Sequence, residues 1–264
     1  MHRTLTIIGC HVLEFVREVG GSFVLLGRSL ARLPELHRTF RQTLVQLEQV
    51  GIGSLPLVFV TSIFVGAVAA VQAAYQFHGY VPMIFLGTVV GKSVILELGP
   101  VLTALVVGGR VAASYAAELG TMKVTEQIDA MEILAIDPAR YLVMPRLVAC
   151  VIMMPVLVIL ADFLAIIGGM FVSNITLGVS ALTFNTGLRL FFSVDDVYSS
   201  VIKAAVFGGI IGLMGCYYGF RTHGGAQGVG KSAMHAVVST CIGVLITNYF
   251  LASVLFRIIF YKAT

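Results

Sequence analysis

Apolar residues along this chain gather into runs of twenty or more positions, and short polar segments separate these runs. No Asp, Glu, Lys or Arg occurs between Gly51 and Gly91. A helix needs about 20 mostly apolar residues to cross the core of a bilayer. The pattern therefore predicts an all-α integral membrane protein with about five membrane-spanning helices, at Leu55–Tyr75, Met83–Ala117, Met144–Val172, Ser200–Phe220 and Ser232–Phe260.

The second predicted span, Met83–Ala117, is longer than a bilayer requires. At about 1.5 Å per residue it measures roughly 50 Å, whereas the apolar core of a bilayer is about 30 Å thick. It contains the dipeptide Gly99-Pro100, and a proline inside a helix removes a backbone hydrogen bond. We expect this helix to tilt, to kink at the dipeptide or to project into water.

Residues 1–50 follow a different pattern. Apolar residues recur there three or four positions apart, and charged residues occupy the other faces. This predicts an amphipathic helix in the membrane interface with a basic lead-in behind it, or alternatively a helix that docks on a soluble partner. Residues 51–264 then form the transmembrane domain. The apolar positions are Val12, Val16, Val19, Phe23, Leu26, Leu30 and Leu33.

Composition and charge agree with a membrane location. The chain is 58% hydrophobic and 11% charged, whereas a soluble domain has roughly 25% charged residues. Basic residues concentrate in the N-terminal segment, in 118–146 and in 221–231, which predicts a cytoplasmic N-terminus and a C-terminus on the outer side. Four isolated cysteines and the scattered basic residues predict no metal site and no nucleic-acid partner.

The segment 118–143, between the second and third predicted spans, is the most charged part of the chain. It predicts a short helix over 125–136, which Asp137-Pro138 ends. An amphipathic helix between two spans is suited to the groove of another subunit, and a helix resting on lipid headgroups is the alternative. The apolar stripe is Ile128, Met131 and Leu134/Ala135, and the polar face is Glu126, Asp129 and Glu132.

Residues Gly225–Ser232 fit the nucleotide-binding pattern GxxxxGK[ST] in every position. That chemistry needs a buried strand before the loop and a carboxylate that binds magnesium. Here a predicted membrane span precedes the segment, and no Asp or Glu follows Ser232. We therefore interpret the segment as a flexible loop whose Ser232 caps the last span, and not as a nucleotide site.

Five ionisable residues lie within the apolar runs, and each costs at least about 2.5–3.5 kcal/mol at bilayer depth unless it faces a cavity or a partner. Lys92 and Glu97 are five positions apart and face each other poorly, so Ser93 is the better local partner of Glu97. The simpler interpretation of Arg110 and Lys203 is that they snorkel to an interface. The five are Lys92, Glu97, Arg110, Asp162 and Lys203.

Several stretches of the chain resemble the MlaE (YrbE) permease family over roughly residues 45–260. The N-terminal helix fits that family in position more than in sequence. The stretches are Glu97–Leu105 (ELGPVLTAL), Gly109-Arg110-Val111-Ala112, Ala117–Met122, Thr125–Met131, Asp137-Pro138, Pro145-Arg146 and the segment Gly224–Ser232.

The resemblance implies a homodimeric permease of an ABC transporter in the bacterial inner membrane, which moves phospholipids between the inner and outer membranes. It implies two cytoplasmic MlaF-like ATPase subunits that bind the ATP, a periplasmic MlaD-like hexamer of MCE proteins and, in some complexes, an MlaB-like STAS protein. This chain would hold no cofactor and would not be an enzyme.

The resemblance also implies site residues. Gln72, Tyr80, Glu97 and Lys203 match positions at the lipid cavity, while Lys92 departs from the family as an added charge there. The hypothesis is that Lys92 or Lys203 contacts the lipid phosphate and Glu97 tunes the pocket. The residues implied in coupling to the ATPase are Glu126, Ile128, Asp129, Met131 and Glu132.

Two other functions fit an apolar bundle. A stand-alone, ion-coupled secondary transporter would be expected to repeat its interrupted helix, and the region around Gly99-Pro100 has no second copy in the sequence. A membrane scaffold has no need of charges inside its spans. The sequence therefore favours the ABC permease.

Overall fold

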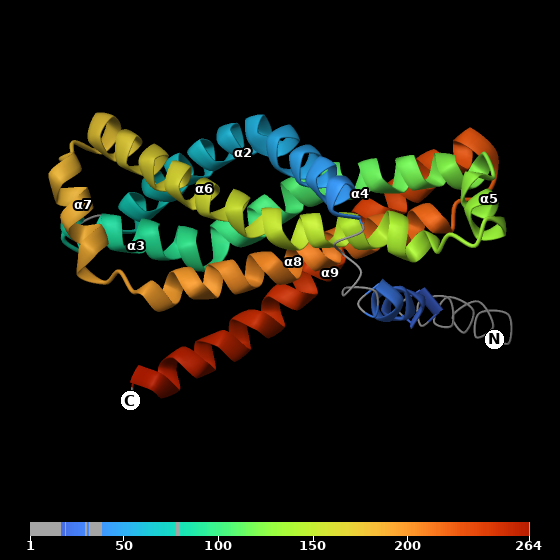
Figure 1. The fold of residues 1–264 in the computed structure, drawn as a ribbon. Coiled ribbons are helices and arrows are strands. Elements are labelled where there is room, and N and C mark those ends of the chain that lie inside the picture. The colour runs from blue at the N-terminus through green and yellow to red at the C-terminus, as the bar shows by residue number, and fades with distance from the viewer. Residues whose placement is uncertain (1–16, 19, 30, 32–38, 78–79, 264) are drawn as a thin grey trace, which may run out of the picture.

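The computed structural model describes residues 17–18, 20–29, 31, 39–77 and 80–263, and every regular element within these ranges is helical (Figure 1). Five stretches are long and apolar enough to cross a membrane. They confirm the predicted spans, and each extends beyond its predicted core. The stretches are Phe40–Phe77, Met83–Val124, Ala139–Leu177, Val194–Phe220 and Gly225–Arg257.

The second span is built from four pieces. A 3-10 turn, η2 (Met83–Phe85), leads into α3 (Leu86–Ser93), then into a π-helical turn, η3 (Val94–Leu98), and finally into α4 (Gly99–Val124). The expected irregularity at Gly99-Pro100 therefore takes the form of a wide turn directly before the proline. In this turn the Gly99 N–H donates to the carbonyl of Val94, five residues back.

The third span repeats this arrangement. A second π-helical turn, η4 (Ala139–Val143), precedes α6 (Met144–Leu177), in which Pro145 lies in the first turn. α6 packs along α2 (Phe40–Phe77), and glycines on both helices let the backbones touch. A Cβ at Gly66 would clash with the carbonyl oxygen of Ala165, and one at Gly168 with that of Ile63.

The polar connection between the third and fourth spans contains a helix that was not predicted from the sequence. α7 (Ala181–Leu190) begins at Ser180, whose hydroxyl accepts the Leu182 N–H at 3.2 Å. It packs on α3 through Gly87 and Gly187, where an added Cβ on either glycine would meet backbone of the other helix. The sequence gives little signal for this helix, because it has no long apolar run and gains its stability from that close crossing.

Figure 1 shows α5 (Gln127–Ile133) at one end of the bundle and α7 at the other, and we call these the α5 end and the α7 end. α4 packs against α8 (Val194–Phe220) and against the first half of α9 (Gly225–Ala263). The second half of α9 leaves the bundle toward the α7 end, with Tyr249 and Phe250 exposed. The single chain thus exposes a large apolar surface.

Part of the predicted amphipathic helix lies within the described residues, where 20–29 are helical. Leu25 packs against the core while Phe23 is exposed, and the Tyr218 hydroxyl donates to Glu18 Oε2 at 3.1 Å at the α5 end. Five of its predicted apolar positions lie outside the described residues: Val12, Val16, Val19, Leu30 and Leu33.

The segment Gly225–Ser232 is helical and forms the first turns of α9. The expectation of a flexible loop with Ser232 as a helix cap is wrong. The chain turns just before, at Gly224 and Gly225, whose φ angles of +87° and +67° lie in the region that favours glycine. The glycines that suggested a loop are therefore used in part for the turn that starts the helix.

The contact between α2 and α6 requires a residue without a Cβ at position 66. We expect Gly66→Ala to lower the free energy of unfolding by about 1–3 kcal/mol, because the added methyl group meets rigid backbone. Denaturation in mixed micelles, followed by circular dichroism, measures this. Gly230→Ala is the control, because nothing lies within 4 Å of a Cβ there, and equal stabilities of the two variants would contradict the packing argument.

Candidate functional site

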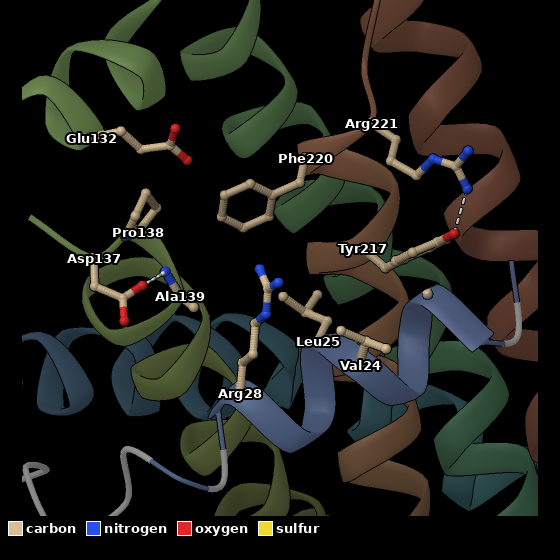
Figure 2. A pocket seen from close by; sticks show the side chains of 11 residues that line it. Val24, Leu25, Arg28, Glu132, Asp137, Pro138, Ala139, Tyr217, Phe220 and Arg221 are labelled. Atoms are coloured by element: carbon tan, nitrogen blue, oxygen red, sulfur yellow. Dashed lines mark hydrogen bonds between the residues drawn. The ribbon is translucent and has the colours of Figure 1, made fainter. Parts of the chain in front are cut away.

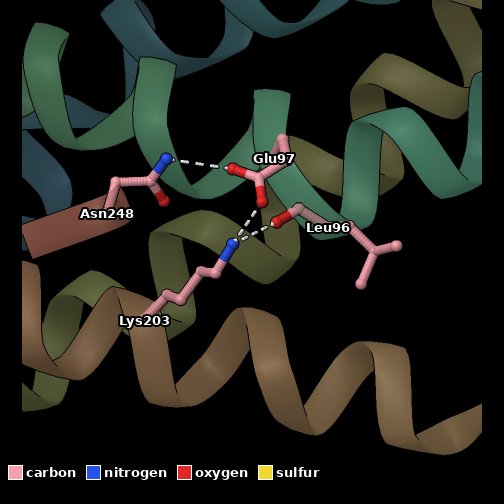
Figure 3. Close-up of polar contacts among 4 residues, drawn as sticks. All are labelled: Leu96, Glu97, Lys203 and Asn248. Atoms are coloured by element: carbon pink, nitrogen blue, oxygen red, sulfur yellow. Dashed lines mark hydrogen bonds and ion pairs between the residues drawn. The ribbon is translucent and has the colours of Figure 1, made fainter. Parts of the chain in front are cut away.

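A cluster of polar groups from three helices lies where η3 meets α8 and α9 (Figure 3). The Lys203 ammonium donates to Glu97 Oε1 at 2.7 Å and to the carbonyl oxygen of Leu96 at 2.8 Å. Asn248 Nδ2 donates to the other carboxylate oxygen, Glu97 Oε2, at 3.0 Å. The structure therefore joins Glu97 and Lys203, two of the predicted cavity residues, in one ion pair.

Lys203 reaches the Leu96 carbonyl for a reason that lies in the sequence. In an α-helix, the N–H of residue 100 would donate to the carbonyl four residues earlier, but Pro100 has no N–H. Lipid supplies no substitute donor, and an unsatisfied carbonyl in the bilayer core costs several kcal/mol. The lysine side chain is 2% exposed and fills that role. The expectation that Lys203 snorkels to an interface is wrong.

Asn248 was not identified from the sequence, where it is a single amide in the last apolar run. Its Oδ1 is buried and accepts no hydrogen bond from the described residues. The Glu97 carboxylate determines which way the amide points, since only the amino group can donate to it. The only sequence signal for Asn248 was that it is an uncharged polar residue inside a predicted span.

Lys92 pairs with Asp196 on α8, and Lys92 Nζ lies 3.3 Å from Asp196 Oδ2. Glu97 pairs with Lys203, so the expected local contact between Glu97 and Ser93 is not the one the structure forms. The wide turn η3 explains how both Lys92 and Glu97 reach α8: a π-helical turn takes up one more residue than an α-helical turn, which brings positions five apart closer to one face.

α8 carries a stripe of buried polar side chains along the face that receives these contacts: Asp196, Ser199, Ser200 and Lys203. The Ser200 hydroxyl donates to Asp162 Oδ2 of α6 at 3.2 Å. Asp162 Oδ1 fills the space that a side chain at position 99 would occupy, so Gly99 is required there. Polar groups therefore bind α8 to both neighbouring spans.

The remaining predicted cavity residues lie apart from the ion pair. Gln72 lines an open apolar groove of about 320 Å³ between α2 and α4. Leu98, the neighbour of Glu97 in the chain, lines the same groove. Tyr80 is exposed at the α7 end. The other lining residues are Phe64, Val65, Val68, Ala69 and Leu102.

Arg110, the fifth ionisable residue of the spans, binds α2. Its guanidinium donates to Ser54 Oγ at 2.8 Å and to the carbonyl of Gln49 at 3.3 Å. Arg110 is exposed, and its snorkelling to an interface stays a prediction.

A second buried cation stands near the α5 end. Arg146 Nη2 lies 2.8 Å from Glu118 Oε1, Nη1 donates to the carbonyl of Leu142 in η4 at 2.8 Å, and the guanidinium lies 5.5 Å from the centre of the Tyr115 ring. This group fastens the start of α6 to the end of α4, directly before the α5 segment. The sequence analysis used Arg146 only as part of the family resemblance.

The predicted short helix between the second and third spans is confirmed as α5, somewhat shorter than expected. Ile128 is buried in the chain's own core and Met131 packs against that core, so both hold α5 to the bundle. Asp129 forms an ion pair of 2.5 Å with Lys123. The apolar side chains that point away are Ile133 and Leu134, which are 86% and 71% exposed.

Figure 2 shows a pocket of about 400 Å³ between α5, α8 and the N-terminal helix. Glu132 of α5, Phe220 and Arg221 at the end of α8, and Arg28 of the N-terminal helix all line it. Glu126 and Ala135, on either side of α5, have φ angles of 60° and 57°. Non-glycine residues adopt these angles rarely, and where they do the site is often functional.

Comparison with known proteins gives consistent matches. The family model described as permease MlaE matches residues 43–254. A probable ABC transporter permease protein of Rickettsia typhi is 40% identical over 254 residues, which cover 96% of this chain and 97% of the relative. A probable ABC transporter permease protein of Synechocystis is 39% identical over 236 residues, covering 89% and 90%.

A plant protein is similar as well. Protein TRIGALACTOSYLDIACYLGLYCEROL 1, chloroplastic, of Arabidopsis thaliana is 34% identical over 234 residues, which cover 89% of this chain and 67% of the relative. The range that matches the family model contains the whole cluster of Glu97, Lys203 and Asn248.

The buried ion pair predicts a large difference between a single and a double substitution. Glu97→Gln leaves the Lys203 ammonium buried without its counter-charge, which we expect to cost about 3–5 kcal/mol of stability. The double variant Glu97→Gln with Lys203→Met removes both charges but also the donor to the Leu96 carbonyl, so we expect it to recover only part of that loss. Denaturation in mixed micelles measures both. Lys123→Gln, in the more exposed pair with Asp129, should cost only about 0–1 kcal/mol.

A double variant that is no more stable than Glu97→Gln alone would contradict this account. The Leu96 carbonyl would then be the dominant partner of Lys203, since the double variant lacks that contact too.

Proposed function

The chain belongs to the MlaE permease family and is the membrane-spanning subunit of an ABC transporter, and from this premise we propose that it moves phospholipids between the inner and outer membranes of a bacterium. The observation that carries the proposal is the half-exposed carboxylate of Glu97 inside a span, one residue before Leu98, which lines an apolar groove. A charge in the bilayer core normally faces a cavity or a partner.

The groove lined by Phe64, Val68 and Leu102 suits an acyl chain, because apolar walls supply most of the binding free energy and a few polar groups orient the ligand. Gln72 and Glu97 are the polar groups we assign to the cavity. The name of the Arabidopsis relative contains that of a glycerolipid, which supports a lipid as the substrate.

The groove is open along the surface of the single chain, and a second copy of the permease would close it. We therefore place the lipid cavity between two protomers. An MlaD-like hexamer of MCE proteins would receive lipid at the α7 end, and an MlaB-like STAS protein would bind the ATPase.

We place the α5 end in the cytoplasm, because the basic connections 118–146 and 221–231 lie at this end and Arg28 lines the pocket beside α5. The C-terminus and α7 then face the periplasm, and the protein is a multi-pass protein of the inner membrane.

An ABC permease works with an ATPase, and we assign α5 as the helix that contacts it. The exposed residues of α5 and its two caps are Glu126, Glu132, Ile133 and Leu134. Ile128 and Met131 attach the helix to the permease. Movement of α5 would reach the cavity through α4, which is anchored by Glu118 at one end and begins beside Glu97 at the other. The 26 residues of α4 span about 39 Å as one rigid helix.

Affinity purification of the tagged chain in mild detergent tests the coupling assignment. We expect the wild type to recover an ATPase and phospholipid, and the variant Glu132→Lys with Leu134→Asp to lose the ATPase but keep the lipid, because both side chains are exposed on α5. Leu182→Asp, on the exposed face of α7 at the opposite end, is the matched control and should keep the ATPase.

A chain that purifies without an ATPase under every condition would refute the transporter assembly proposed here and favour a stand-alone secondary transporter. Retention of the ATPase by the α5 variant would instead place the contact elsewhere on the α5 end.

The orientation has its own test. We expect Leu182→Cys to react with a membrane-impermeant maleimide in intact spheroplasts, and Ile133→Cys to react only after lysis. The two exposed positions lie at opposite ends of the bundle, which we assign to opposite sides of the membrane. Labelling is measured by the mass shift on a gel, with the unmodified chain as the background control. The reverse pattern would invert the assigned orientation.

A further inference from the structure

The second span and α8 form two ion pairs that expose opposite charges, and we propose that together they select a zwitterionic phospholipid headgroup. This inference rests on the proposed function, because it names the class of lipid that the same site accepts. The observation behind it is the difference in solvent exposure between the two members of each ion pair.

In the pair beside the groove, the carboxylate is the accessible member. The Glu97 side chain is 47% exposed, whereas that of Lys203 is 2% exposed and its ammonium already donates to Glu97 and to the Leu96 carbonyl. A lipid phosphate cannot reach Lys203, and at this point it would meet the carboxylate instead. A headgroup ammonium would meet a hydrogen-bond acceptor.

In the pair nearer the α7 end, the exposure is reversed. The Lys92 side chain is 41% exposed and that of Asp196 is 8% exposed. Of the two lysines that the sequence suggested as phosphate ligands, only Lys92 is available. A ligand therefore finds a positive charge at Lys92 and a negative charge at Glu97.

The spacing of these two charges fits one headgroup. Five residues of α-helix rise about 7.5 Å, which is an upper limit here because part of the stretch is the π-helical turn η3. Lys92 and Glu97 both reach α8, so they lie toward the same neighbour. A phosphate and an ammonium joined by two carbons span a gap of this order when each makes a hydrogen bond of about 3 Å. A glycerol headgroup would place an uncharged hydroxyl against Glu97.

Asn248 is a positioning residue in this arrangement. Its amide donates to Glu97 Oε2 while Lys203 donates to Oε1, so the carboxylate is held from both sides. Each carboxylate oxygen can accept two hydrogen bonds, which leaves an acceptor on each oxygen for the ligand. The carboxylate is thus fixed in place and still able to bind.

The test uses the full chain reconstituted in vesicles of equal parts phosphatidylethanolamine and phosphatidylglycerol. The protein is then extracted in mild detergent, and the phospholipid that stays bound is quantified by mass spectrometry. We expect an excess of bound phosphatidylethanolamine of about two- to fivefold, the range that one accessible ion pair provides.

Two variants separate the charges. Glu97→Gln with Lys203→Met removes the accessible carboxylate without leaving a buried ammonium unpaired, and we expect the ratio of the two bound lipids to fall to one. Lys92→Gln should lower the total of bound phospholipid and leave a ratio above one. Arg257→Gln, which removes an exposed cation of α9 outside both pairs, is the matched control and should change neither quantity.

A ratio of one in the wild type would overturn the headgroup selection, and bound phospholipid in that same sample would leave the proposed function standing. A wild type that retains no phospholipid would refute both. If the double variant fails to fold, the wild-type ratio and the effect of Lys92→Gln still decide the matter.

Discussion

The bundle depends on Lys203, whose ammonium group satisfies both a carboxylate and a backbone carbonyl that lipid cannot solvate. Pro100 creates the need by removing the N–H that would serve Leu96, and the wide turn η3 presents Glu97 to the same lysine. Each of the three groups would be costly alone in an apolar bundle. Together they produce a buried cation and a half-exposed carboxylate.

The Arg146 group near the α5 end follows the same logic. There too a π-helical turn precedes a proline, a buried cation donates to a carbonyl of that turn, and a glutamate of the second span completes the ion pair. The two groups anchor α4 near its ends, at Glu97 and Glu118. A helix fastened in this way can move as a rigid body, which is the route by which we propose that movement of α5 reaches the proposed cavity.

Much of the fold was predictable because the bilayer imposes a simple rule. Every apolar run long enough to cross the membrane became a helix, including the composite second span. α7 was missed, since a ten-residue helix has no such run and is stabilised by its glycine crossing with α3. The segment 225–232 was wrongly assigned to a loop because glycines suggest flexibility, whereas here the preceding span and the long last helix leave room only for a short turn.

The sequence by itself determined the number of the spans and the position of their cores, because a run of apolar residues can be buried in lipid only as a helix. It also determined the short helix α5 and the set of charged residues that had to find partners inside the membrane. It could not determine the pairs. Lys92 with Asp196, and Glu97 with Lys203 and Asn248, join residues about 100 to 150 positions apart. Only the packing of η3 against α8 and α9 decides which of them meet and which member of each pair stays exposed.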